Sequence, residues 1–100
     1  MAQIALDKQK VEVFCRKHGI RRLSLFGSVL RPNFQFDSDV DVLVEFDFGY
    51  TPGMLGIVRL EKELTSIFGG RKVDLRTPED LSRYFRQEVL REAEVQYAQG

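Results

Sequence analysis

The chain has 100 residues, of which 43% are hydrophobic and 30% are charged, a composition typical of one globular domain with a modest core. Lys and Arg balance Asp and Glu at 15 each, so we expect no direct binding of nucleic acid. The single cysteine excludes an internal disulfide framework and fits a reducing compartment, and no apolar run approaches the length of a membrane span. These features predict a cytoplasmic protein.

The first predicted element is a helix over residues 6–18. Its apolar residues recur at roughly helical spacing, and Gly19 is typical of the residue that follows the end of a helix. We expect Cys15 on the buried face of this helix. We expect His18, the only histidine, at its end, where it lacks the partners of a metal site.

A short strand is predicted to end at Gly27, and the next segment, SVLRP, predicts one helical turn with Ser28 as N-cap and Pro32 closing it. Residues 33–38 predict a loop. Residues 39–46, DVDVLVEF, alternate strictly between two faces, as a half-buried strand does. One face carries Val40, Val42, Val44 and Phe46, and the other carries Asp39, Asp41, Leu43 and Glu45.

The strongest helical pattern begins at residue 52 and ends at two glycines, with a predicted apolar stripe of Leu55, Val58, Leu60, Leu64, Ile67 and Phe68. A strand follows over residues 71–76. Thr77 and Pro78 predict the N-cap and first position of a helix, and a final helix is predicted over residues 82–97. This order predicts an α+β fold, an α/β sandwich in which helices flank a sheet of three to four strands.

Two aspartates on one strand face indicate a metal site. Asp39 and Asp41 would lie with their Cα atoms roughly 7 Å apart, and like charges repel unless a cation lies between them. Mg²⁺ prefers oxygen ligands and leaves room for phosphate oxygens, and a pair of such ions suits nucleotidyl transfer. Asp74 in KVDLR would join the same face if the two strands are neighbours.

The segment just upstream of these acids has features of a phosphate site. Gly27 lets the backbone approach a phosphate, and Ser28 offers a hydroxyl at a helix N-terminus, where an anion is favoured. Arg31 is one turn further along. Each feature alone has a plainer explanation, as a solvated strand face, a turn or a surface charge, but their combined order favours a nucleotide site.

The segment LFGSVLRPNFQFDSDVDVLVEF resembles the signature of the minimal nucleotidyltransferases (MNT) of the DNA polymerase beta superfamily, Gly-Ser-x-x-Arg-Gly, a loop and then Ser-Asp-x-Asp. The resemblance continues through LEKELTSIFGGRKVDLRTPEDL and covers nearly the whole chain. It implies a single minimal nucleotidyltransferase domain over residues 1–100, built on a small mixed sheet.

Carried over by position, the resemblance implies a catalytic site that uses ATP with Mg²⁺ or Mn²⁺. The metal-binding and catalytic residues would be Asp39, Asp41 and Asp74, and the nucleotide-binding residues would be Gly27, Ser28, Arg31 and Ser38. Three residues depart from the pattern. Pro32 replaces the second glycine, and Gln35 and Phe36 stand where many members have Arg-Pro.

The resemblance also implies an antitoxin that transfers AMP from ATP to a tyrosine of a cognate HEPN toxin, typically a ribonuclease, and forms a complex with it. The alternative is a catalytically weak or inactive domain that neutralises the toxin by binding alone. Transfer to a small molecule ranks last, because this minimal domain has no second domain to enclose such an acceptor. The sequence also leaves open whether the chain forms a homo-oligomer.

Aromatic residues that cluster in sequence around the site predict an apolar surface that docks a helical partner. Phe34 and Phe36 lie in a loop with little core to enter, although Phe46 and the loop could also fold together as core. The predicted cluster consists of Phe34, Phe36, Phe46, Phe48 and Tyr50.

Overall fold

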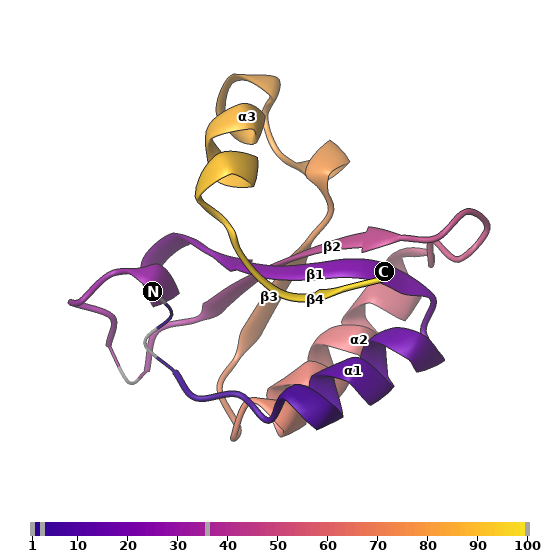
Figure 1. The fold of residues 1–100 in the computed structure, drawn as a ribbon, viewed down its shortest axis with the longest axis horizontal. Coiled ribbons are helices and arrows are strands. Elements are labelled where there is room, and N and C mark those ends of the chain that lie inside the picture. The colour runs from indigo at the N-terminus through magenta and orange to yellow at the C-terminus, as the bar shows by residue number, and fades with distance from the viewer. Residues whose placement is uncertain (1, 3, 36, 100) are drawn as a thin grey trace.

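A computed structural model of the chain describes residues 2, 4–35 and 37–99 and shows a sheet with helices on both faces (Figure 1). The elements in chain order are α1 (Lys8–Lys17), β1 (Ile20–Phe26), the 3-10 helix η1 (Gly27–Leu30), β2 (Val40–Phe46), α2 (Met54–Ile67), β3 (Val73–Arg76), the 3-10 helix η2 (Pro78–Asp80), α3 (Arg83–Glu92) and β4 (Glu94–Ala98). None of the described helices is long and apolar enough to cross a membrane.

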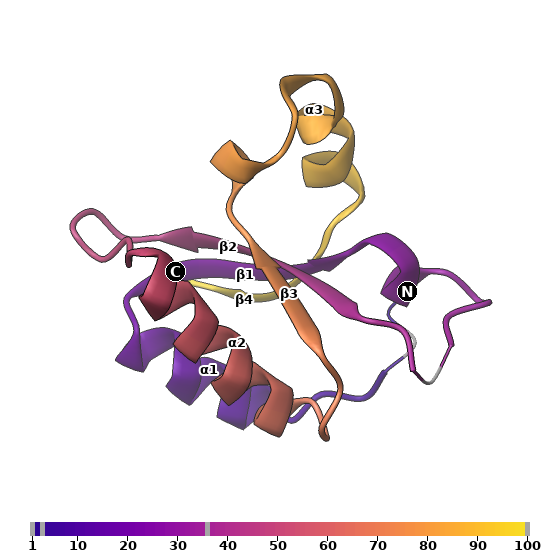
Figure 2. The ribbon, with the colours of Figure 1, turned by 180° about the vertical axis from the view of Figure 1, so that it is seen from behind.

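The sheet has four strands in the order β3-β2-β1-β4. β1 pairs antiparallel with both β2 and β4, whereas β2 pairs parallel with β3, so the sheet is mixed. Parallel neighbours need a crossover connection, which α2 provides between β2 and β3. Views from the front and from behind agree that α1 and α2 cover one face of the sheet and α3 stands on the other (Figures 1 and 2). The predicted α+β class and strand number are confirmed.

The core lies between the sheet and the pair α1 and α2. β2 sends its valines into this core, as the alternation predicts, and all three are fully buried together with side chains of both helices. The main buried residues of this layer are Phe14, Cys15, Leu23, Leu25, Val40, Val42, Val44, Leu60, Leu64 and Phe68. Burial raises the pKa of the Cys15 thiol to about 12, so this cysteine is an inert core residue, as predicted.

Helix α1 is confirmed, although it begins two residues later than predicted. The side chain of Asp7 accepts hydrogen bonds from the backbone N–H groups of Gln9 and Lys10, and this N-cap fixes the start of the helix. His18 is the C-cap, and Gly19 follows with a φ of 65°. This positive φ is typical of the residue after a helix, so the predicted helix end is confirmed.

The predicted final helix over residues 82–97 is wrong in its last five residues. α3 ends at Glu92, and residues 94–98 form β4, which pairs with β1 and closes the open edge of that strand. Tyr97 faces Leu23 of β1, and the N–H of Gln99 donates to the Arg21 carbonyl at 2.8 Å. These long-range hydrogen bonds override the helical preference of the segment, and a local sequence pattern does not report them.

The start of α2 also differs from the prediction. Leu55 and Val58 are 76% and 41% exposed, and the buried side consists of Ile57, Leu60, Leu64, Ile67 and Phe68. Leu55 lies two residues before Ile57, which turns it about 200° around the helix axis and away from the sheet. Gly69 and Gly70 follow the helix with positive φ angles, so its predicted end is confirmed.

Two predicted helix caps have different outcomes. Ser28 is not an N-cap, because η1 begins one residue earlier, at Gly27, and Phe26 occupies the cap position without a side-chain hydrogen bond. Thr77 does form a capping box with Asp80 around Pro78, but the helix that it caps, η2, has only three residues.

The predicted apolar docking surface is divided in the structure. Phe34 and Phe46 are partly buried and pack against the core, and the guanidinium of Arg71 lies 5.4 Å from the ring centroid of Phe34. Phe48 is fully exposed and Tyr50 is 58% exposed. Phe36 lies outside the described residues, so the five aromatic side chains do not form one described surface.

The burial pattern of α2 predicts that two leucines of one helix contribute very differently to stability. Leu64→Ala should lower the free energy of unfolding by about 2–5 kcal/mol, because it leaves a cavity in the core. Leu55→Ala, the matched control on the exposed side, should change it by less than about 0.5 kcal/mol. Urea denaturation followed by circular dichroism measures both, and equal effects would contradict this orientation of α2.

Candidate active site

The parallel pairing of β2 with β3 brings two of the predicted site residues together. Asp41 and Asp74 are direct partners in the register of the two strands. Their sequence neighbours Val40, Val73 and Leu75 are buried in the core, so both aspartates face the opposite side of the sheet. Asp39 immediately precedes β2 and is exposed. The strand of Asp74 therefore lies beside the DVDVLVEF strand, as the sequence analysis required if Asp74 was to join the acidic face.

The end of β1 adds Gly27 to this group. Phe26 is the partner of Asp41 in the antiparallel register, and Gly27 follows with a φ of 76°, a conformation that disfavours any side chain. A Cβ atom placed on Gly27 would collide with Oδ2 of Asp41 and lie 3.3 Å from its Cγ. The sequence analysis predicted that this glycine allows a phosphate to approach the backbone. In the structure, the group that approaches the backbone here is the carboxylate of Asp41.

The carboxylates influence one another electrostatically. The pKa of Asp41 is raised, first because the group is partly buried and then because Asp74 and Asp39 place negative charge beside it. The positive charge of Arg76 acts in the opposite direction. Asp39 and Asp74 thus both act electrostatically on the partly buried Asp41.

Asp74 has a direct cationic partner. Nη2 and Nε of Arg76 donate to its Oδ2 at 3.3 and 3.4 Å, and both side chains are partly exposed. In the part of the chain that the structure describes, no three His, Cys, Asp or Glu side chains are arranged to hold a metal ion. In this structure the Asp74 carboxylate is thus paired with Arg76.

The donor atoms of this group suit a hard cation. All three candidate ligands are carboxylates, and oxygen donors favour Mg²⁺ or Mn²⁺ over the softer metals that thiolates select. The missing side chain of Gly27 allows the Asp41 carboxylate to lie close to the backbone at the end of β1. These features fit a divalent ion at Asp39 and Asp41, with the Asp74 carboxylate beside Asp41 on the same face of the sheet.

The predicted nucleotide-binding residues lie at two places. Ser28 and Arg31 are exposed on η1 and at its C-terminal end, next to Gly27, and the Arg31 N–H donates to the Ser28 carbonyl at 3.0 Å. Ser38 is partly buried, and its N–H donates to the carbonyl of Gln35 at 3.1 Å, which orders the turn before Asp39.

A small pocket of about 200 Å³ adjoins this turn and was not predicted from the sequence. Ser38 lines it together with two basic residues and the glycines that end α2. The full lining consists of Asp37, Ser38, Gly69, Gly70, Arg71 and Lys72. Of the three departures from the family pattern, Pro32 and Gln35 are exposed, and Phe36 lies outside the described residues.

Arg76 is the site residue that the sequence analysis missed. It stands two positions after Asp74 in the strand, so the same alternation that placed Asp74 on the acidic face also places Arg76 there. An arginine that follows an aspartate at this spacing is the signal that could have identified it.

The raised pKa of Asp41 predicts that its charge destabilises the folded chain. The folded protein holds this proton more tightly than the unfolded chain does, so stability is lost as the pH rises from the ordinary aspartate range through the folded pKa. Asp41→Asn should therefore be more stable than the parent at neutral pH, and the difference should vanish at a pH below the ordinary pKa of aspartate. Denaturation curves at the two pH values measure this.

Glu45→Gln is the matched control for this test. Glu45 lies on the same face of β2, but its carboxylate faces cations, with Arg21 at 3.7 Å and Arg22 at 3.5 Å. Neutralising it should not stabilise the protein. A neutral-pH gain in both variants, or in neither, would show that the burial of Asp41 and its acidic neighbours do not cause the effect.

Comparison with known proteins identifies the family of the chain. Residues 9–99 match the family model described as Polymerase beta, Nucleotidyltransferase. A relative from Methanocaldococcus jannaschii, assigned by name to the protein adenylyltransferases, is 37% identical over 86% of this chain and 89% of its own length. The protein adenylyltransferase MntA of Thermococcus cleftensis is 38% identical over 76% of this chain and 74% of its own length.

Solved structures agree with this fold. A structure assigned as a minimal nucleotidyltransferase matches with a TM-score of 0.70 and 38% identity, covering 86% of this chain and 85% of its own. A toxin–antitoxin crystal structure with AMP-PNP matches with a TM-score of 0.74 and 22% identity, over 94% and 75% of the two chains. A complex of a tri-AMPylated HEPN toxin from Shewanella oneidensis with its MNT antitoxin matches with a TM-score of 0.64 and 19% identity, over 92% and 70%. The chain belongs to the nucleotidyltransferase family of the polymerase beta type.

Proposed function

We propose that this chain is a metal-dependent protein adenylyltransferase and an antitoxin, which transfers AMP from ATP to a tyrosine of a cognate HEPN toxin. The observation that carries this proposal is the meeting of Asp41, Asp74 and Gly27 at one point of the sheet, in a chain of the nucleotidyltransferase family. The relatives named as protein adenylyltransferases support the acceptor class. The neighbours that contain a HEPN toxin or AMP-PNP support the partner and ATP.

In this proposal Asp39 and Asp41 hold the divalent cation, Mg²⁺ or Mn²⁺, and Asp74 is the third ligand. When bound, the cation supplies positive charge to the triphosphate and lowers the pKa of the attacking hydroxyl. Gly27 and Ser28 bind the phosphates at the start of η1, and exposed Arg31 adds a cationic side chain at the end of this turn. Ser38 keeps the approach to Asp39 in place through its turn hydrogen bond.

The reaction exchanges one phosphorus–oxygen bond for another. The tyrosine hydroxyl oxygen of the toxin attacks the α-phosphorus of ATP, and the bond from this phosphorus to the oxygen that bridges to the β-phosphate breaks. AMP stays on the tyrosine, and pyrophosphate leaves. A tyrosine hydroxyl has an ordinary pKa near 10, so its proton needs an acceptor at neutral pH. Asp74 is the acid that takes or directs this proton in our proposal.

A reaction that uses ATP and Mg²⁺ fits a cytoplasmic location, where both are abundant. The second candidate function is neutralisation by binding alone. It would need a partner-binding surface, but it would have no use for the acids Asp39 and Asp74 beside Asp41. For this reason we favour the enzyme over the binding module.

Replacement of Asp74 separates the two functions. Asp74→Asn keeps the shape of the side chain and removes its charge, so the variant should still bind ATP and the toxin. It should transfer AMP at least about a hundredfold more slowly, the lower end of a general-base contribution. Mass spectrometry of the toxin after incubation with ATP and Mg²⁺ measures the transfer. A parent protein that adds no AMP mass while it still neutralises the toxin would favour neutralisation by binding, and equal rates for parent and variant would remove Asp74 from the site.

Nucleotide binding should depend on the first two acids. In calorimetry with Mg²⁺ or Mn²⁺, the parent should bind ATP in a metal-dependent manner, and Asp39→Ala/Asp41→Ala should lose this dependence because the cation ligands are gone. Glu88→Ala/Glu92→Ala removes two exposed carboxylates of α3 and is the control for the change in net charge. Unaltered binding by the aspartate variant would contradict the proposed metal site.

A further inference from the structure

The contact between Arg76 and Asp74 occupies the third member of the acid group. Two nitrogen atoms of the guanidinium, Nη2 and Nε, donate to the same oxygen of Asp74, at 3.3 and 3.4 Å. The other oxygen of this carboxylate has no part in the contact. A cation of the chain itself therefore lies where the proposed reaction needs Asp74 to be available.

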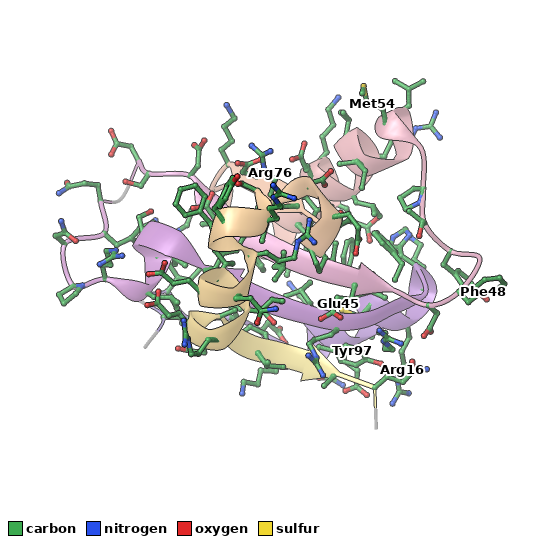
Figure 3. The ribbon with its side chains drawn as sticks, turned by 90° about the horizontal axis from the view of Figure 1, so that it is seen from above. Arg16, Glu45, Phe48, Met54, Arg76 and Tyr97 are labelled. Atoms are coloured by element: carbon green, nitrogen blue, oxygen red, sulfur yellow. The ribbon has the colours of Figure 1, made fainter. Side chains whose placement is uncertain are left out.

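Arg76 belongs to the acidic face by its position in the sheet. It ends β3, lies opposite Leu43 of β2 in the parallel register, and is 48% exposed in its side chain. Figure 3 looks onto the α3 side of the sheet and shows the Arg76 side chain on this side. Its positive charge also reaches Asp41, where it opposes the effect of the neighbouring acids.

We propose that Arg76 is a positioning residue that competes with the divalent cation for Asp74. It holds this carboxylate in an ion pair while no cation is bound and releases it when the cation enters. The inference rests on the proposed function and adds a residue that sets how much metal the site requires.

The physical reason is the charge of the group. Three carboxylates without a cation repel one another, and Arg76 offsets one of their charges in the metal-free protein. An ion pair between partly exposed side chains is weak, so an entering divalent cation can replace it.

Binding of Mn²⁺ to the nucleotide-free protein tests this inference without any need for activity. Free Mn²⁺ is measured by electron paramagnetic resonance during titration of the parent and of Arg76→Gln, which keeps most of the side-chain length and loses the charge. We expect Arg76→Gln to bind Mn²⁺ about two- to fivefold more tightly, the factor that corresponds to an ion pair of this exposure. Arg76→Lys keeps the charge and should stay near the affinity of the parent.

Arg22→Gln is the matched control. Arg22 is also an exposed strand arginine in an ion pair, but its partner is Glu45, at 3.5 Å, which is outside the acid group. This variant should bind Mn²⁺ as the parent does. An Arg76→Gln affinity equal to or weaker than that of the parent, or an equal gain in Arg22→Gln, would overturn the role of Arg76.

The same proteins distinguish failure of this inference from failure of the proposed function. AMP transfer to the toxin is measured at a series of Mg²⁺ concentrations. If Arg76 competes with the cation, Arg76→Gln should reach half its maximal rate at a lower Mg²⁺ concentration than the parent. If the parent transfers AMP but the Mg²⁺ dependence and the Mn²⁺ affinity of Arg76→Gln are unchanged, the competition is wrong and the proposed function stands. If the parent transfers no AMP, the proposed function fails, and the Mn²⁺ titration alone decides the inference.

Discussion

The parallel register between β2 and β3 is the constraint on which the rest of the site depends. It sets Asp41 directly opposite Asp74, and the buried neighbours Val40 and Val73 keep both acids on the side away from the main core. The register is stabilised by the crossover helix α2, whose inward side is buried against the sheet. A shift of one residue would turn the acids into the core and the valines toward solvent. Hydrophobic burial thereby enforces the approach of like charges.

Two residues reduce the cost of bringing the acids close together. Gly27 leaves out a side chain at the one place where it would meet the Asp41 carboxylate, and Arg76 pairs with Asp74. The pKa of Asp41 remains raised in spite of Arg76, because the group is partly buried and two further acids lie beside it. A site that binds a cation and a triphosphate benefits from such uncompensated charge, because the ligands relieve it. Stability and ligand affinity are therefore opposed at this point of the fold.

Sequence patterns predicted the parts of this architecture that depend on local alternation. The two-residue period of DVDVLVEF assigned Asp41 to one face and the valines to the other, and the same argument assigned Asp74. β4 was missed because its hydrogen bonds to β1 join residues far apart in the chain. The meeting of Gly27 with Asp41 also needs the register of two strands, which no local pattern reports. Arg76 could have been predicted, since it follows Asp74 at strand spacing.

The central claim is that one cation-binding centre lies between the start of β2, the middle of β3 and the end of β1. Line broadening of backbone amide signals by substoichiometric Mn²⁺ in nuclear magnetic resonance spectra locates that centre directly. Our account predicts that the amides of Gly27, Asp41 and Asp74 broaden first, although they are separated in sequence, while that of Glu88 in α3 stays sharp. First broadening at the acids of α2 or α3, with Gly27 and Asp74 unaffected, would contradict it.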